Sequence, residues 1–388
     1  HSNAPVSRYD TVIIAISSHR DTQMPNLGWS YPSELQHMVH QHWRGFASPQ
    51  IYYTSFFFIA YFVLMFTSLF GNGLVIWIFS TSKNLRTPSN LLIINLAIFD
   101  LIMCTNMPHY LLNTIVGYVV GGDLGCDIYA VNGGISGLGA AVTNAFIAYD
   151  RFKTISNPID GRLNFMQIGF LIILSWLWTI PFSVLPFFRI WGRYMPEGYL
   201  TTCSFDYLSD DDETRFFIRA MFSWAYCIPM IMICTYYGKL FCHVREHERM
   251  LADQARKMNV KSLSANANLA AMSVELRIAK AALTIYLLYV IAWTPYATVA
   301  LLGTFDQREL ITPFVSMLPA TFAKAVSCFD PWVYAASHPK YRLELERRLP
   351  WLGVREKSLS SSGGTGNSKD RGSINDGDSA TVSMDTMA

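Results

Sequence analysis

The stretch SMLPATFAKAVSCFDPWVY, Ser316 to Tyr334, has the apolar character of a membrane helix but carries a lysine in its middle. A charged amine at the centre of a bilayer costs roughly 3 kcal/mol on insertion scales. Lys324 must therefore be neutral, paired or covalently bound, and a desolvated lysine is a nucleophile suited to forming a Schiff base. On these residues alone, the alternatives are a salt bridge with Asp100 or Asp330, or a solvated transporter cavity.

The composition of the whole chain agrees with a protein that crosses a membrane several times. Of its 388 residues, 51% are hydrophobic and 15% are charged, and the charged fraction lies below the roughly 25% of soluble domains. The net charge of +2 gives no reason to expect a nucleic-acid partner. The seven cysteines show no spacing with each other or with histidine that indicates a metal site.

Seven mostly apolar runs are each long enough to cross a bilayer, for which a helix needs about 20 residues. They predict an all-α membrane protein with a seven-transmembrane helix bundle over residues 52–337. The runs are Tyr52–Ser80, Ser89–Val116, Cys126–Phe152, Phe165–Phe188, Phe216–Val244, Arg277–Gly303 and Leu310–Ser337.

The charges between these runs predict the orientation of the chain. Lys and Arg gather after the first, third, fifth and seventh runs, whereas the other connections carry Asp and Glu. The basic side should be cytoplasmic, which makes residues 1–51 an extracellular segment. Residues 338–354 are amphipathic and should form an eighth helix in contact with membrane lipid. Residues 355–388 are rich in Ser, Gly and Asp and should form a disordered cytoplasmic tail.

A set of short motifs carries a resemblance to a known family. Any one of them is weak evidence, but all of them in order on seven predicted helices resemble the rhodopsin-like class of G-protein-coupled receptors. They are GNGLV (71–75), NLAIFD (95–100), AYDRFKT (148–154), AWTPY (292–296) and DPWVY (330–334), together with Cys126 and Cys203. In opsins the retinal-binding lysine lies six residues before the last motif, and Lys324 has this place.

Finer features resemble one group of opsins. The stretches EHERMLADQARKMNVKSL and SHPKYRLELE are similar to the third cytoplasmic loop and eighth helix of invertebrate visual pigments. Ultraviolet-tuned insect opsins carry a lysine in the second helix just before an x-Pro step, and Asn106 stands there in TNMPHY. The resemblance is therefore to the blue-type insect visual opsins.

This resemblance implies that 11-cis-retinal or 11-cis-3-hydroxyretinal is bound to Lys324 as a Schiff base. A protonated Schiff base is a buried cation and needs an anion. Invertebrate pigments use a glutamate six residues before the loop cysteine, which implies Glu197 as counterion; the alternative is a solvated loop acid. Tyr129 is the implied hydrogen-bonding neighbour of the Schiff base, and Asn106 either tunes colour there or packs between helices.

Further site residues follow from the same resemblance. A disulfide bridge should join Cys126 to Cys203, with two free thiols as the alternative. The pocket for the chromophore should be apolar with aromatic walls. Its expected lining is Gly133, Gly134, Gly137, Met221, Phe222, Tyr226, Trp293, Tyr296 and Ala320.

The resemblance also implies how a signal would leave the molecule. Arg151 should pair with Asp150 and Glu275 in the dark, and breaking these pairs would open a cleft for a G protein; the alternative is a surface ion-pair cluster of small worth. The expected switch also includes the last motif, through Asp330, Pro331 and Tyr334. Phe152 replaces the commoner tyrosine after the arginine.

The implied function is a light receptor of the rhabdomeric photoreceptor plasma membrane. Light isomerises the chromophore from 11-cis to all-trans, and the receptor activates a heterotrimeric G protein of the Gq class. Arrestin and a receptor kinase are the other expected partners. The alternatives are a retinal photoisomerase without signalling, a light-driven ion pump, and a receptor for a diffusible ligand. The long basic third loop, the preserved Arg151 and the absence of acids in the stretch 131–148 argue against the first two, and Lys324 argues against the third.

Overall fold

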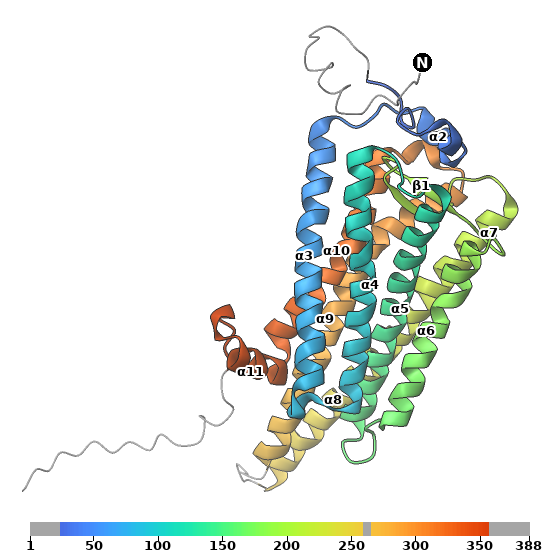
Figure 1. Ribbon diagram of the computed structural model, residues 1–388. Coiled ribbons are helices and arrows are strands. Elements are labelled where there is room, and N and C mark those ends of the chain that lie inside the picture. The colour runs from blue at the N-terminus through green and yellow to red at the C-terminus, as the bar shows by residue number, and fades with distance from the viewer. Residues whose placement is uncertain (1–23, 259–264, 357–388) are drawn as a thin grey trace, which may run out of the picture. The chain divides into compact units, whose positions relative to one another are not determined.

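The computed structural model describes residues 24–258 and 265–356. Within them, seven long helical segments run side by side as a bundle (Figure 1), which confirms the predicted fold class. The segments are α3 (Ile51–Thr81), α4 (Pro88–Val116), α5 (Gly122–Ser156), α6 (Phe165–Phe187), a fifth segment made of α7 (Asp212–Phe222), the π-helical turn η3 (Ser223–Cys227) and α8 (Ile228–Met258), then α9 (Ala265–Thr304) and α10 (Pro313–Ser337).

The fifth and sixth segments extend further than the apolar runs that predicted them. Helix α8 continues to Met258 and α9 begins at Ala265, beyond the predicted limits at Val244 and Arg277. The sequence between those limits is rich in Ala, Leu, Met, Glu and Arg, which favour helix without being continuously apolar. Much of the expected third loop is therefore helix, and its residues 259–264 lie outside the described part of the chain.

Two helices of the bundle are more polar than a membrane span usually is. Five helices in the described ranges are long and apolar enough to cross a membrane, and α5 and α10 are not among these five. Helix α5 contains Asp127 and Asn144, and α10 contains Lys324 and Asp330. Most of α5 is buried by its neighbours, whereas much of α3 is exposed. Polar residues are tolerated in such helices because they face the bundle interior and not lipid.

Helix α10, which carries Lys324, has well-defined ends. Thr312 caps its first turn by accepting a hydrogen bond from the Val315 backbone N–H at 3.2 Å, and Pro313 follows at the first helical position. The helix ends at Ser337, and His338 then caps α11 (Pro339–Arg348) through its Nδ1, 3.2 Å from the backbone N of Tyr341. A capping side chain satisfies an N–H that the helix leaves unpaired.

One end of the bundle is covered by a β-hairpin, and we call it the hairpin end. Strands β1 (Tyr194–Glu197) and β2 (Thr202–Phe205) pair antiparallel, with Glu197 opposite Thr202. Residues 24–50 fold over the same end (Figure 1), where Tyr31 donates a hydrogen bond to the Leu200 carbonyl oxygen at 2.7 Å. The turn needs Gly198, which has a φ of +63° and no room for a Cβ beside Met317.

The predicted eighth helix is present as α11, followed by the short turn η5 (Pro350–Leu352). Its apolar stripe packs on the bundle, because Tyr341 and Leu345 are buried and the Tyr341 ring stacks on Phe79 with centroids 5.3 Å apart. Contact of this helix with lipid stays a prediction. The predicted tail over 355–388 lies outside the described residues, apart from its first two.

Candidate functional site: a buried lysine beneath a hairpin

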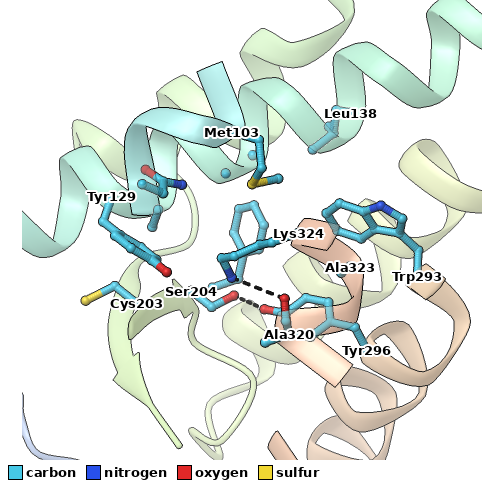
Figure 2. Close-up of a pocket in the computed structure, with 15 residues that line it drawn as sticks. Met103, Tyr129, Leu138, Cys203, Ser204, Trp293, Tyr296, Ala320, Ala323 and Lys324 are labelled. Carbon is cyan, nitrogen blue, oxygen red and sulfur yellow. Dashed lines mark hydrogen bonds between the residues drawn. The ribbon is translucent and has the colours of Figure 1, made fainter. Parts of the chain in front are cut away.

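Lys324 lies inside the bundle, on the face of α10 that points at α5 (Figure 2). Only 8% of the residue is exposed. Its Nζ is 3.5 Å from the carbonyl oxygen of Ala320 and 5.6 Å from the centre of the Tyr129 ring. Among the described residues it forms no salt bridge, so the ion pair with Asp100 or Asp330 that the sequence left open is not observed. The amine is thus buried without an adjacent anion.

The amine opens onto an apolar cavity with about 470 Å³ of empty space. A second cavity of about 560 Å³ shares four lining residues with the first: Leu138, Phe205, Trp293 and Tyr296. The two together form an elongated apolar slot between α5, α9, α10, the hairpin and the fifth segment. All nine residues predicted to line a pocket lie on it: Gly133, Gly134, Trp293, Tyr296 and Ala320 at the first cavity, and Gly137, Met221, Phe222 and Tyr226 at the second.

Glycines of α5 allow neighbouring side chains to pack directly on its backbone beside this slot. A Cβ on Gly137 would lie 2.6 Å from Cη2 of Trp293, and a Cβ on Gly134 would lie 2.6 Å from the Ser183 hydroxyl. Such distances are far below van der Waals contact, so any larger residue would displace its neighbour. The indole of Trp293 therefore packs directly on the backbone of α5.

Glu197 lies in strand β1 of the hairpin, outside the residues that line the two cavities. It is 2% exposed, and its Oε2 accepts a hydrogen bond of 3.0 Å from the Tyr207 hydroxyl. Burial raises the pKa of Glu197, and the positive charge of Lys324 acts in the opposite direction. The alternative that Glu197 is a solvated loop acid is therefore wrong. Its carboxylate is within electrostatic reach of the amine, although no salt bridge joins the two.

Several buried polar atoms around the lysine have no hydrogen-bond partner in the described part of the chain. They are both amide atoms of Asn106, the hydroxyl of Tyr129 and Oε1 of Glu197. Buried polar groups are nearly always paired, because an unpaired one costs free energy. The region around Lys324 therefore offers donors and acceptors to a ligand that is itself largely apolar. A conjugated aldehyde such as retinal fits this combination of amine, slot and polar atoms.

A disulfide bridge holds the hairpin over the slot. Cys126 of α5 and Cys203 of β2 are bonded, with Cα atoms 5.3 Å apart. This confirms the predicted pairing and excludes two free thiols at these positions. Because β2 is bonded to α5 and β1 pairs with β2, Glu197 is held above Lys324 by covalent and backbone bonds.

Comparison with known proteins shows the family to which this arrangement belongs. The family described as 7 transmembrane receptor (rhodopsin family) matches residues 71–334. The chain belongs to this family. It is 69% identical to Opsin Rh5 of Drosophila melanogaster over 362 aligned residues. The alignment covers 93% of this chain and 92% of that protein.

Two further likenesses extend this finding. The chain is 53% identical over 335 residues to the protein named Opsin, blue-sensitive, of Apis mellifera, covering 86% of this chain and 89% of the other. The crystal structure of squid rhodopsin superposes with a TM-score of 0.78 at 32% identity, over 82% of this chain and 92% of that one. The protein is thus a visual opsin, an integral membrane receptor that senses light and couples to G proteins, and not an enzyme.

At the other end of this opsin, which we call the arginine end, a buried guanidinium joins two helices. Arg151 of α5 is 5% exposed and contacts Oδ2 of Asp150 through Nη2 at 2.5 Å and Nε at 3.0 Å. Its Nη1 donates to Oε2 of Glu275 on α9 at 3.2 Å. Ser89 of α4 donates to the second oxygen of Asp150 at 2.9 Å. Asp150 and Arg151 are buried and Glu275 is partly buried, which argues against a surface cluster. The switch role of the three predicted residues stays a prediction.

The residues of the DPWVY motif lie between the slot and the arginine end. Asp330 and Tyr334 are buried, and the carboxyl of Asp330 interacts with that of Asp100 on α4. Pro331 packs so closely on α3 that a Cβ on Gly71 would be 2.9 Å from the ring. The motif thus packs α10 against α3 and α4, and its part in switching stays a prediction.

The structure adds residues that were not predicted from the sequence. Tyr207 and Ser316 extend the hydrogen bonding of Glu197, with 2.9 Å between their hydroxyls, and Ser204 is hydrogen-bonded to Tyr296 (Figure 2). Ser316 precedes Lys324 by eight residues and therefore lies on the same helix face, which is a signal that could have been used. Tyr207 gave no such signal, because its position depends on where the chain turns after β2.

Proposed function

We propose that this opsin binds 11-cis-retinal or 11-cis-3-hydroxyretinal on Lys324, absorbs blue light and activates a G protein of the Gq class. The observation that carries the proposal is a buried amine at an apolar slot, with no salt bridge and with nearby polar atoms that lack partners among the described residues. The blue range is supported by likeness to a protein named as blue-sensitive and by Asn106 in the place of a lysine.

Lys324 would hold the chromophore covalently. The neutral amine would supply the nitrogen of the Schiff base: its two hydrogens would leave with the aldehyde oxygen as water, and one proton taken up from solvent would give the protonated form. Bound retinal supplies light absorption and the change from 11-cis to all-trans. The slot residues would exclude water and bound the space for the polyene, and Trp293 packs on Gly137 at its wall.

Glu197 would serve as the counterion of the protonated nitrogen. It is a carboxylate within electrostatic reach of Lys324 and is held there by the hairpin. Tyr129 and Asn106 would complete the polar surroundings of the nitrogen, since both line its cavity and have unpaired polar atoms. A distant, buried anion stabilises a cation strongly because the local dielectric is low.

Arg151 would hold the receptor inactive in the dark. Its contact with Glu275 links α5 to α9, so loss of this contact frees the arginine end of α9. A movement of α9 there would expose a surface for a G-protein helix. In this orientation the hairpin end is extracellular and the arginine end is cytoplasmic, in a rhabdomeric plasma membrane. A receptor kinase and arrestin would act on the tail, which lies beyond the described residues.

Absorption spectroscopy of the full chain reconstituted with 11-cis-retinal tests this proposal. We expect a visible band that is lost in Lys324→Ala, and borohydride should trap retinal on the wild-type chain alone. Glu197→Gln should move the band to the ultraviolet at neutral pH. A colourless product at every pH, or equal colour without the lysine, contradicts the binding site.

Signalling needs a second measurement. Illuminated receptor should accelerate nucleotide exchange on a purified Gq-class protein. Exchange on a Gi-class protein alone would contradict the coupling. A pigment that isomerises retinal and stimulates exchange on neither protein would be a photoisomerase.

A further inference from the structure

Glu197 is held by two residues that no part of the proposed function uses. Its Oε2 accepts from the Tyr207 hydroxyl at 3.0 Å, and that hydroxyl is 2.9 Å from Oγ of Ser316. All three side chains are buried, with 2%, 3% and 0% of Glu197, Tyr207 and Ser316 exposed. The three residues come from β1, from the chain just after β2, and from α10. We call them the carboxylate clamp.

The direction of the hydrogen bonds within the carboxylate clamp follows from the available protons. An ionised carboxylate only accepts, so Tyr207 must donate its single proton to Glu197. Ser316 must then donate to the oxygen of Tyr207. Burial raises the pKa of Tyr207 well above its usual value, which keeps this proton on the phenol. Both hydroxyl dipoles therefore point toward the carboxylate.

This arrangement leaves the two oxygens of Glu197 in different positions. Oε2 is engaged by Tyr207, whereas Oε1 is buried and has no partner among the described residues. The remaining titratable groups around Glu197 come from four helices: Tyr61 of α3, Tyr129 of α5, Lys324 of α10 and Tyr296 of α9. The Tyr296 hydroxyl is also a hydrogen-bond donor to the carboxylate. Of these, only Lys324 carries a charge that favours the carboxylate.

We propose that Tyr207 and Ser316 are positioning residues that keep Glu197 ionised and leave Oε1 free for the Schiff-base region. The inference rests on the proposed role of Glu197 as counterion. A hydrogen bond to the ionised form of a buried carboxylate stabilises that form, and a second donor behind the first strengthens it. Ser316 stands two helical turns before Lys324 on the same face of α10, so the clamp and the amine belong to one rigid element.

The test is a double-mutant cycle read by spectroscopy on the full chain reconstituted with 11-cis-retinal. The quantity measured is the pH at which half of the visible band is lost. Tyr207→Phe should lower this midpoint by roughly one to two pH units, the worth of a hydrogen bond to a charged group. Ser316→Ala should lower it in the same direction by less. In a Glu197→Gln background, Tyr207→Phe should have no further effect.

Tyr194→Phe is the matched control. Tyr194 lies in the same hairpin, is 3% exposed, and donates a buried hydrogen bond of 2.7 Å to the Ser183 carbonyl oxygen. This variant should lower thermal stability and leave the midpoint in place. A general loosening of the hairpin would shift the midpoint equally in Tyr194→Phe and Tyr207→Phe, or equally with and without Glu197, and either result overturns the proposal.

The outcomes separate this inference from the counterion assignment. A midpoint unchanged by Glu197→Gln rejects Glu197 as counterion, and the clamp falls with it. A midpoint shifted by Glu197→Gln but unchanged by Tyr207→Phe rejects the clamp alone. If Tyr207→Phe does not fold, Ser316→Ala in the two backgrounds decides the question, because it removes only one oxygen atom.

Discussion

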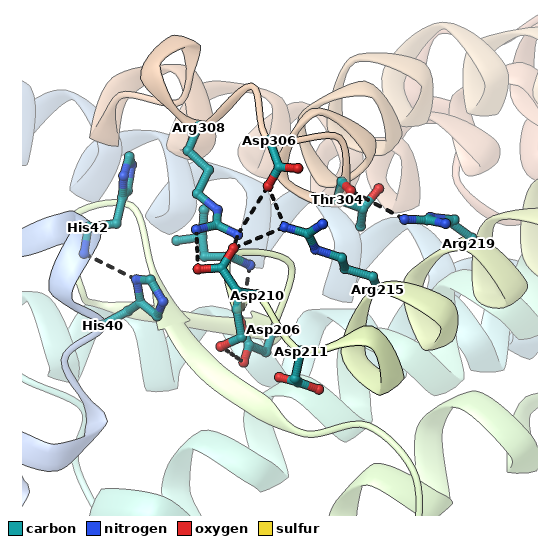
Figure 3. A network of polar contacts seen from close by, with 12 residues as sticks. His40, His42, Asp206, Asp210, Asp211, Arg215, Arg219, Thr304, Asp306 and Arg308 are labelled. Carbon is teal, nitrogen blue, oxygen red and sulfur yellow. Dashed lines mark hydrogen bonds and ion pairs between the residues drawn. The ribbon is translucent and has the colours of Figure 1, made fainter.

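The two ends of this opsin are fastened by different kinds of bonds. At the hairpin end, a disulfide and the strand pairing are joined by a set of ion pairs across the loops (Figure 3). Arg215 contacts Asp210 and Asp306, and Arg308 contacts the same two aspartates. At the arginine end, the contact between Arg151 and Glu275 is a polar link between α5 and α9.

The two ends differ in how far their charged side chains are exposed. The side chains of Asp210 and Asp306 are 72% and 64% exposed, and each has two arginine partners. Exposed ion pairs contribute little singly, so losing one leaves the hairpin end closed. Arg151 is buried, and removing one partner of a buried pair has a larger effect. At the hairpin end α9 is thus followed by exposed ion pairs. At the arginine end its Glu275 contacts the buried Arg151 at 3.2 Å and the exposed Arg162 at 3.7 Å.

Of the changes considered, removing the disulfide at the hairpin end should have the largest effect on stability and pigment formation. Replacing Cys126 and Cys203 together by serine should lower the free energy of unfolding by about 2–5 kcal/mol, because the bridge closes a long loop. It should also reduce pigment formation, since Glu197 would no longer be held over the slot. Thermal bleaching rates and pigment yield measure the two effects. Cys234→Ser, at an exposed free cysteine, is the control; equal results for both variants would contradict the role of the bridge.

Weakening the contact between Arg151 and Glu275 at the arginine end should have the next largest effect, which is a rise in dark activity. Glu275→Gln weakens a charge-assisted hydrogen bond to Arg151, and such bonds are worth roughly 1.5–3 kcal/mol. Even the lower part of that range should raise nucleotide exchange in the dark by roughly five- to thirtyfold.

The control for that measurement is Glu246→Gln, at an exposed glutamate of α8. It should leave dark exchange unchanged. Dark activity that stays at the wild-type level in Glu275→Gln would mean that other contacts hold the arginine end closed.

Neutralising Asp210, one of the exposed aspartates paired with arginine at the hairpin end, should have a smaller effect on stability. The two neighbouring arginines lower the pKa of Asp210 to about 2. A carboxyl with a lowered pKa stabilises the folded state above its unfolded pKa of about 3.9 and loses that effect as the pH falls through about 2. The melting temperatures of wild type and Asp210→Asn should therefore differ slightly and constantly near neutral pH and converge in acid. A difference that grows in acid would contradict this sign.

The smallest expected effect concerns His37, which lies 2.9 Å from Asp123 on the outside of the hairpin end. The hydrogen bond to Asp123 raises the pKa of His37. A raised pKa stabilises the folded state fully below the unfolded value of about 6.5, and the effect is lost as the pH rises through the folded pKa. Melting curves of His37→Gln and wild type should differ only on the acid side of that transition; a difference confined to alkaline pH would contradict the contact.

Much of the fold could be predicted because its signals are local. Each helix crosses the membrane with its own backbone hydrogen bonds satisfied, so a run of apolar residues is enough to indicate it. The prediction was also correct for the more polar helices α5 and α10, which carry recognisable sequence motifs. It was less accurate where α8 and α9 extend past the apolar runs, because helix propensity there is not accompanied by hydropathy.

The candidate site was predictable only in part. A lysine in hydrocarbon is conspicuous, and the spacing between Lys324 and Asp330 matched a family pattern. The identity of the slot residues came from that resemblance, since an aromatic residue in a membrane helix is usually ordinary core. Glu197 was named for the same reason. Nothing local to YMPEGYL distinguishes a buried glutamate from a solvated one.

The amino-acid sequence by itself determined that this chain crosses a membrane seven times. It also determined that a lysine amine lies in the membrane, where it must be neutral, paired or covalently bound. Both follow from the cost of placing charge and unpaired backbone groups in hydrocarbon, which depends on composition along the chain. Only the tertiary structure decided that Glu197 is buried, that Tyr207 bonds to one of its oxygens and Ser316 to Tyr207, and that Arg151 contacts α9. Those contacts bring together residues far apart in the chain, and their distances depend on how loops and helices pack.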